Sequence, residues 1–154
     1  MGFTTPCIIR KNTTKIRDRL KELDYNCNPY LGWHNLYTTI HGYASVYSMN
    51  DDDINVLSKK IDSFIDCGVN ENLFLAIAAL RDDTNKNQWF IADSLLSVSY
   101  DDTVGNDHYF IEPKGSMFFW DINWMNATII SGNFHKATVE ELIEHFKEKE
   151  ENHG

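Results

Sequence analysis

The sequence predicts an α+β fold, in which a mainly antiparallel sheet of short strands packs with three or four helices, one of them buried. Two observations lead to this prediction. Three segments that follow a good N-cap residue repeat apolar residues at helical spacing. Between the second and third of these segments, apolar residues recur at every second position instead, which is the spacing of half-buried strands. When the helices of a chain are segregated from a run of strands, the strands usually pair antiparallel with one another.

The first two helices are predicted from their caps and from the width of their apolar stripes. Thr13 caps a segment with one charged face and one apolar face, the latter formed by Ile16, Leu20 and Leu23. A second helix begins near Asn70 and continues through Leu73–Leu80, which is apolar nearly all round. A helix with no polar face belongs in the core. The second helix is therefore expected to be the central buried one.

The third helix opens with a capping box of Thr138 and Glu141, followed by an apolar stripe of Val139, Leu142, Ile143 and Phe146. The spacing of Ile54, Leu57 and Ile61 indicates a fourth helix after Asp53, although Asn, Asp and Ser are frequent there. A short apolar segment and a turn precede each of the three caps, and these segments are Ile8-Ile9, Phe64-Ile65 and Asn133-Phe134. Each cap is therefore expected to follow a short apolar segment and a turn of a few residues.

Strands are predicted where polar and apolar residues alternate. Met117–Trp124 places Phe118, Trp120, Ile122 and Trp124 on one face. Leu96, Val98 and Tyr100 alternate with serines in the same way. Leu36–Thr39 and Gly42–Tyr47 flank His41-Gly42, which is expected to be a hairpin turn.

Length and composition indicate one domain in a reducing compartment. The 154 residues are 42% hydrophobic and 24% charged, which is typical of a globular protein, and no linker rich in Pro, Gly or Ser divides them. The three cysteines, Cys7, Cys27 and Cys67, form no C-x-x-C pair. No apolar run typical of a secretory signal lies between Met1 and Thr14, and the longest apolar run is far shorter than a membrane span. We therefore expect a cytoplasmic protein.

The net charge of −9 and the pI of about 5.0 narrow the classes of partner. Direct nucleic-acid binding requires clustered Lys and Arg, whereas the 14 basic residues are spread along the chain. An anionic membrane surface would repel the chain. The classes of partner that remain are another protein and a second copy of the chain. An acidic DNA mimic would need carboxylates spaced like phosphates along one face, but here they are scattered among lysines.

Four sequence blocks resemble a family of small uncharacterised proteins from Bacteroides-type gut bacteria and their phages and mobile elements. The blocks cover less than half of the chain and are Gly2–Thr13, Ile65–Gly68 continued by Asn70–Asp83, Asn87–Phe90 and Phe134–Ile143. The resemblance implies a shared scaffold of capped helices and an origin in a phage or mobile element, where accessory proteins are common. It implies no catalytic residue, because no activity is established for the family.

A zinc site is one interpretation of Cys27, His34 and His41, which follow one another at equal spacings of seven residues. Structural zinc sites instead bring their ligands in tight pairs. A buried thiol and two partly exposed histidines are therefore the favoured interpretation, and no metal or cofactor is predicted.

Calcium is rejected for the acidic segment that begins at Asp51. Asp51, Asp53 and Asn55 mimic the start of an EF-hand loop, but Val56 and Asp62 occupy positions that require Gly and Glu. Acidic residues at a helix N-terminus explain the segment better.

Cys67 is the best candidate for a reactive thiol, because it lies just before the Asn70 cap and a helix N-terminus can lower a thiol pKa. The alternative is a cysteine packed at the end of a strand, which is the commoner case. No catalytic residue is predicted.

The surplus of aromatic residues suggests a binding surface, although most aromatic residues in strands belong to a core. The predicted interaction face consists of Trp33, Tyr37, Tyr43, Tyr47 and Phe119, and Trp33 and Phe119 are expected to be exposed. The function expected from the sequence is that of a non-enzymatic accessory protein that binds another protein or itself. The alternatives are an enzyme or metal-dependent protein that uses Cys67 or the set Cys27, His34 and His41, and a DNA-mimic inhibitor.

Overall fold

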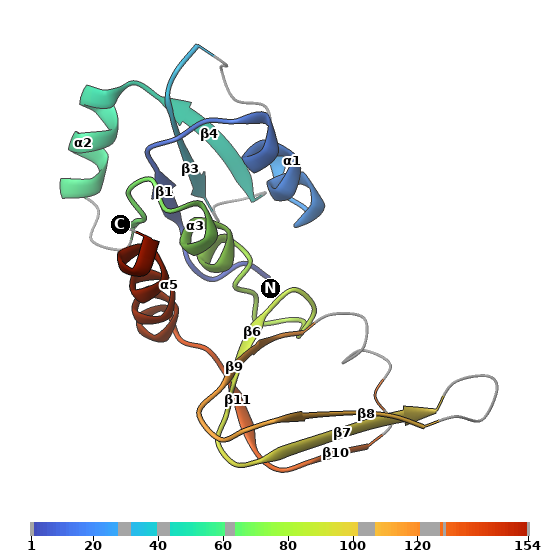
Figure 1. Cartoon of the computed structure of the whole chain (residues 1–154). Helices are drawn as coiled ribbons and strands as arrows, with labels where there is room; N and C mark the ends of the chain where they lie inside the picture. Colours follow the sequence, from blue (N-terminus) through green and yellow to red (C-terminus); the bar gives the residue numbers. More distant parts are fainter. Residues whose placement is uncertain are drawn as a thin grey trace. The chain divides into compact units, whose positions relative to one another are not determined.

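The computed structural model describes residues 2–27, 32–39, 44–60, 64–101, 107–120, 127 and 129–153, with side chains except at 60, 100–101, 107–109, 129 and 148–153. It confirms the predicted α+β class (Figure 1). Contacts divide the chain into two compact units. Unit 1 comprises Met1–Asp83 and Val139–Gly154, and unit 2 comprises Thr84–Thr138.

The capped helices belong to unit 1. They are α1 (Thr14–Glu22), α3 (Glu71–Ala78) and α5 (Val139–His153). Thr13 Oγ1 accepts the N–H of Ile16 at 3.2 Å, and Asn70 Oδ1 accepts the N–H of Leu73 at 3.0 Å, so both predicted caps satisfy a free donor of the first turn. As predicted, α3 is the buried helix, and its buried residues are Leu73, Phe74, Ala76, Ile77 and Ala78.

The fourth helix is α2 (Asp51–Lys60), and it buries Ile54 completely. It begins slightly before the predicted start, because Asn50 acts as its cap: Asn50 Oδ1 accepts the N–H of Asp53 at 2.8 Å.

Unit 1 contains a five-stranded sheet in the order β2-β4-β3-β1-β5. Its strands are β1 (Cys7–Ile9), β2 (Asn26–Cys27), β3 (Asn35–Thr39), β4 (Ser45–Met49) and β5 (Ile65–Asp66). β3 pairs antiparallel with β1 and β4, but the β1–β5 and β2–β4 pairs are parallel. The turn predicted at His41-Gly42 lies outside the described residues, between the paired strands β3 and β4.

The two faces of this sheet differ in burial. Leu36 and Thr38 of β3 and Val46 of β4 are at most 2% exposed. Cys7 on the same face lies with its Sγ 3.8 Å from the carbonyl oxygen of Phe74 in α3. Because side chains alternate along a strand, the residues between them lie on the opposite face.

The described residues of unit 2 include two three-stranded antiparallel sheets, so the strands predicted between the second and third capped helices are confirmed. One sheet has the order β11-β6-β9 and the other β10-β7-β8. The strands are β6 (Trp89–Ala92), β7 (Leu96–Asp101), β8 (Asp107–Glu112), β9 (Met117–Phe119), β10 (Ile129–Ser131) and β11 (Phe134–Lys136). Both sheets contribute to one core, which contains Phe90, Ala92, Leu96, Val98, Phe118 and Trp120.

The strand predicted over Met117–Trp124 ends earlier, at Phe119. Trp120, just after the strand, is still held by a backbone hydrogen bond, because its N–H donates to the carbonyl oxygen of Gln88 at 2.9 Å. Phe118 and Trp120 are buried and Phe119 is exposed, so the predicted alternation holds at these positions. Ile122 and Trp124 lie outside the described residues.

A glycine closes the bend between β10 and β11. Gly132 has φ +111°, and a Cβ atom there would lie 2.5 Å from the carbonyl oxygen of Leu95 and 2.8 Å from Cδ2 of Leu96. The N–H groups of Asp93 and Ser94 both donate to the carbonyl oxygen of Asn133. The bend therefore needs a residue without a side chain.

Candidate functional site

The open face of the sheet in unit 1 presents a group of aromatic side chains. Tyr37 of β3 lies opposite Tyr47 of β4, and on its other side it lies opposite Ile8 of β1. The two tyrosine rings stack, with centroids 5.5 Å apart and planes 28° apart. Phe64 approaches Tyr37 edge-on, with ring centroids 6.0 Å apart. We call Tyr37, Tyr47 and Phe64 the aromatic face.

The side chains of the aromatic face differ in their exposure to solvent. Ile8 is fully buried, Tyr37 and Phe64 are partly buried, and Tyr47 is 48% exposed. Aromatic pairs in this geometry contribute about 0.5–1.5 kcal/mol beyond their buried area. Burial and the neighbouring Tyr47 raise the pKa of Tyr37. The Tyr37 phenol is therefore neutral at physiological pH, and an uncharged ring can enter an interface without the cost of burying a charge.

A charged pair lies at the β5 edge of the same sheet. Arg10 donates to Asp66 at 2.8 Å and to Asn55 of α2 at 2.6 Å. Burial alone would raise the pKa of Asp66, but hydrogen bonds from Arg10 and from the N–H of Gly68 outweigh this effect and lower it. Arg10 and Asp66 therefore both find hydrogen-bond partners within unit 1.

The structure brings together only part of the predicted interaction face. Tyr37 and Tyr47 are adjacent, and Trp33, 40% exposed, lies in the turn before β3. Phe119 is 36% exposed but belongs to unit 2, where it lies against Trp89 with ring centroids 5.1 Å apart. Tyr43 lies outside the described residues.

One feature of this site could have been found in the sequence, and another could not. A hairpin turn centred on Gly42 places Tyr37 opposite Tyr47, because both are five residues from it. Phe64 was missed, because its contact with Tyr37 depends on the position of β5 beside β1. No local pattern encodes that pairing.

Cys67 follows β5 and is 5% exposed. A hydrogen bond with Cys7, together with burial, raises its pKa strongly. A buried thiol with a raised pKa carries little nucleophilic thiolate at neutral pH. These observations favour the packed-cysteine interpretation over the reactive one.

Cys27 and His34 lie on separate elements, and His41 lies outside the described residues. Cys27 is in β2, where burial is the largest effect on its pKa and raises it, while Lys21 and Arg17 lower it. His34 is exposed in the turn before β3. Within the described part of the chain, no three His, Cys, Asp or Glu side chains are grouped as metal ligands.

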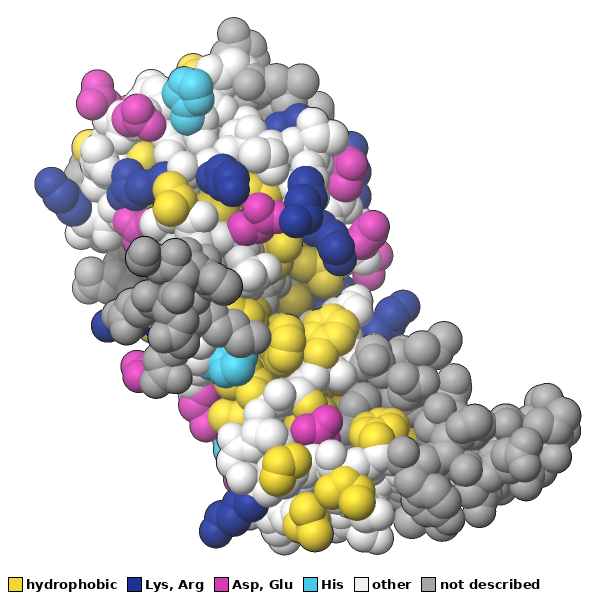
Figure 2. All heavy atoms as spheres, in the orientation of Figure 1, with side chains coloured by type: hydrophobic (Ala, Val, Ile, Leu, Met, Phe, Trp, Pro, Cys, Tyr) yellow, Lys and Arg dark blue, Asp and Glu magenta, His cyan; other side chains and the backbone are white. Residues whose placement is uncertain are grey.

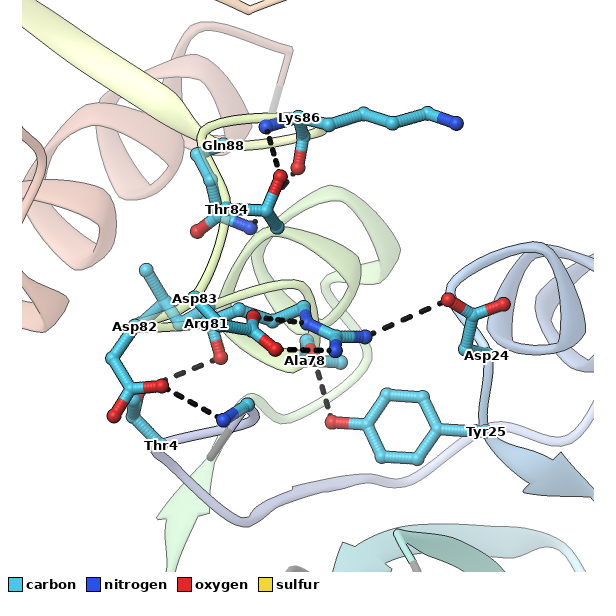
Figure 3. A network of polar contacts seen from close by, with 12 residues as sticks. Thr4, Asp24, Tyr25, Ala78, Arg81, Asp82, Asp83, Thr84, Lys86 and Gln88 are labelled. Atoms are coloured by element: carbon cyan, nitrogen blue, oxygen red, sulfur yellow. Dashed lines mark hydrogen bonds and ion pairs between the residues drawn. The ribbon is translucent and has the colours of Figure 1, made fainter.

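A polar network joins the start of unit 1 to the segment after α3 (Figure 3). Arg81 donates twice to Asp83, at 2.8 and 2.9 Å, and lies 3.6 Å from Asp24. Its guanidinium is 4.4 Å from the ring centroid of Phe3, which in turn stacks on Tyr25 at 4.2 Å.

The network is satisfied internally. Hydrogen bonding to Arg81 lowers the pKa of Asp83 to about 2. Asp82 Oδ1 accepts the N–H of Gly2 at 2.7 Å, and Tyr25 donates to the carbonyl oxygen of Ala78 at 2.6 Å. Because these groups pair with one another, we assign the network a structural role.

One histidine–carboxylate pair was not singled out from the sequence. His135 Nδ1 of β11 lies 2.8 Å from Asp93 Oδ1, and both side chains are exposed. A carboxylate in this position fixes the orientation and tautomer of an imidazole. The pair spans the corner closed by Gly132 and Asn133, so it also ties together the ends of two strands.

Charges of both signs are interspersed on the face shown in Figure 2. Glu71 lies 3.5 Å from Lys11 and 3.4 Å from Lys15, and Asp66 pairs with Arg10. Such pairing breaks up a continuous row of carboxylates.

Comparison of the chain with protein-family models, with curated proteins and with solved structures finds no match. The resemblance to small proteins of Bacteroides-type bacteria and their mobile elements therefore stays a prediction. Among the described residues, no helix has both the length and the apolar character needed to cross a membrane.

Proposed function

We propose that the chain is a non-enzymatic accessory protein that acts by binding another protein through the aromatic face. The observation that carries this proposal is the stacked pair of Tyr37 and Tyr47 on the paired strands β3 and β4, with Tyr47 48% exposed. Tyrosine supplies a large contact area at a low cost in conformational entropy. It is also among the residues that dominate the energy of interfaces.

Rigidity supports this assignment. Tyr37 and Tyr47 lie opposite each other within two paired strands, and Phe64 holds the Tyr37 ring from the side. A surface that is already ordered loses little freedom on binding, so more of the contact energy contributes to affinity.

The charge of the chain favours a protein over a nucleic acid as the partner, since −9 repels phosphate. We place the protein in the cytoplasm, because its three cysteines are free and Cys7 and Cys67 are buried as thiols. An origin in a phage or mobile element would suit an accessory role.

The proposal is tested by Tyr47→Ser, with Val69→Ser as the matched control. Val69 is 68% exposed in unit 1 and lies in the turn before α3, outside the three residues of the aromatic face. Tagged wild-type protein and both variants are produced in the source cell, and the proteins that copurify are quantified. Removal of an interface tyrosine typically costs about 2 kcal/mol or more, so recovery of the partner with Tyr47→Ser should fall by ~10-fold or more.

The control variant should recover the same partner as the wild type. Circular dichroism establishes that both variants are folded. Equal recovery with Tyr47→Ser and Val69→Ser would refute the proposal, as would the lack of any partner enriched over a mock purification.

A further inference from the structure

The segment that leads into α1 and runs through it is the most basic part of the chain. Residues 10–21 contain six of the 14 basic residues and one acidic residue, which is a local net charge of +5, so the rest of the chain carries −14. A surface that is basic against such a background attracts negative charge that the remainder of the protein repels.

Arg17 and Lys21 lie on one flank of α1. The helix buries Ile16 and Leu20, and successive helical residues are about 100° apart, so the residues that directly follow these two lie on the same side. Burial raises the pKa of Cys27 in β2, and the nearby Lys21 and Arg17 act against this effect. Both cations therefore lie close to β2. We call Arg17 and Lys21 the basic flank.

The opposite flank of α1 is partly neutralised within unit 1, whereas the basic flank is not. Lys15 lies 3.4 Å from Glu71 of α3, which also lies 3.5 Å from Lys11. Within the described part of the chain, neither Arg17 nor Lys21 forms an ion pair with a carboxylate. Two cations four residues apart destabilise a helix, and the first turn of α1 lacks the acidic residue that would stabilise it. Departures from such local rules are expected at functional positions.

Arg17 is held in a position to bind a carboxylate. Its guanidinium donates to Asn12 Oδ1 and, at 3.0 Å, to Thr14 Oγ1. A guanidinium has five N–H donors, so three of them have no partner among the described residues. Asn12 also donates to the carbonyl oxygen of Trp33 at 2.7 Å, so Trp33, 40% exposed, borders the basic flank. Arginine and tryptophan are enriched among the residues that dominate binding energies.

We infer that the basic flank, bordered by Trp33, binds an extended segment of a partner protein that is rich in Asp and Glu. A carboxylate matches a guanidinium in charge and in geometry, because the two groups can form two parallel hydrogen bonds. Arg17 and Lys21 are separated by about 6 Å along the helix axis. Carboxylates at alternate positions of an extended segment are about 6.6 Å apart, so one can meet each cation.

A nucleic acid suits the basic flank less well than an acidic protein segment. It would present phosphates beyond the two cations, and these would approach the carboxylates that give the rest of the chain its charge of −14. A short acidic segment ends before it reaches them, and charges more than about 8 Å away are largely screened at physiological salt. The inference goes beyond the proposed function, because the basic flank shares no residue with the aromatic face.

An NMR titration of the isotope-labelled full chain with end-capped hexaglutamate tests the inference. The amide signals of α1 should shift most, and a few exposed charge pairs predict a Kd of about 1 mM at ~100 mM salt. Arg17→Gln and Lys21→Gln should each raise this Kd by about 3-fold or more, and so should an increase of the salt to ~500 mM.

Arg19→Gln is the matched control. Arg19 is exposed and directly precedes Leu20, so its replacement removes the same charge from the opposite flank of the same helix. Charges more than about 10 Å apart are largely screened at ~100 mM salt, so the Kd should change by less than about 2-fold. Lys21→Gln keeps the test valid if Arg17→Gln disturbs the start of α1, because only Arg17 donates to Asn12 and Thr14.

Unchanged α1 signals at about 5 mM peptide would overturn the inference. Equal effects of Arg17→Gln and Arg19→Gln would do the same, because the peptide would then respond only to net charge. Tighter binding of hexathymidylate would assign the flank to nucleic acid, and self-association that Arg17→Gln removes would assign it to a second copy; either result would show the inference to be wrong. Tyr47→Ser should bind hexaglutamate like the wild type, so this inference and the proposed function can fail independently.

Discussion

Replacement of Gly132 by alanine tests how tightly the corner of unit 2 is packed. Gly132 has φ +111°, a conformation that costs a residue with a Cβ atom about 1–3 kcal/mol. The new methyl group would also lie 2.5 Å from the carbonyl oxygen of Leu95 and 2.8 Å from Cδ2 of Leu96. Relief of such overlap in a packed core typically costs a further 1–3 kcal/mol or so. We expect Gly132→Ala to lower the free energy of unfolding by about 3 kcal/mol or more.

Gly115→Ala is the matched control within the same unit. Gly115 also has a positive φ, +88°, but a Cβ atom there would meet nothing within 4 Å. Its replacement should therefore cost only the backbone term of about 1–3 kcal/mol. The difference between the two variants isolates the steric cost at the corner.

Urea denaturation followed by tryptophan fluorescence measures both variants, because Trp89 and Trp120 lie in unit 2. With a typical slope of 1–3 kcal/mol per M, the midpoint of Gly132→Ala should fall by about 1–3 M. Equal losses in Gly132→Ala and Gly115→Ala would refute the reasoning. That result would mean that the carbonyl of Leu95 and the side chain of Leu96 move aside at no cost.

Three further predictions concern unit 1. Asp24 follows Leu23, the C-cap of α1, and has φ 77°, a conformation that glycine adopts more easily. Asp24→Gly should therefore raise the free energy of unfolding in urea by about 0.5–1 kcal/mol. A loss of stability would show that the 3.6 Å ion pair between Asp24 and Arg81 matters more. Asn70→Ala should lower it by about 1 kcal/mol, because the N–H of Leu73 loses its cap; Asn70→Asp should retain most of the stability, and equal effects would exclude the cap as the cause. Arg81→Gln should return the pKa of Asp83 from about 2 towards 3.8 in a carboxyl NMR titration, whereas an unchanged pKa would exclude Arg81 as the cause. In the wild type, the stability from this lowered pKa is fully present above about pH 3.8 and is lost as the pH falls towards 2.

The helices could be predicted because their signals are local. A cap such as Thr13 or Asn70 acts on an N–H three residues away, and an apolar stripe needs only one helix face. The burial of α3 followed from its composition alone. Strand alternation was equally local, which is why Phe118 and Phe119 were assigned to opposite faces.

The remaining features depend on contacts between distant segments. The parallel pairing of β1 with β5 joins Cys7 to Ile65, and no turn signal specifies it. The contact between Phe64 and Tyr37 depends on that pairing. Nothing in the composition near Asp83 or Thr138 marks the boundary between the units, so Phe119 was grouped with tyrosines that belong to the other unit. Long-range pairing, rather than local propensity, determines which aromatic residues share a face.

The return of the chain to unit 1 after unit 2 has a consequence for synthesis on the ribosome. Unit 2 is closed on itself near its ends, where Lys136 Nζ donates to the carbonyl oxygen of Thr84 at 2.9 Å. It can therefore complete its core before α5 has been made. Until α5 arrives with Leu142 and Phe146, the apolar surface of α3 on that side has no cover. A nascent chain that pauses after Thr138 would carry a folded unit 2 and an incomplete unit 1. The uncovered apolar surface of α3 in that intermediate is the kind of surface that chaperones bind.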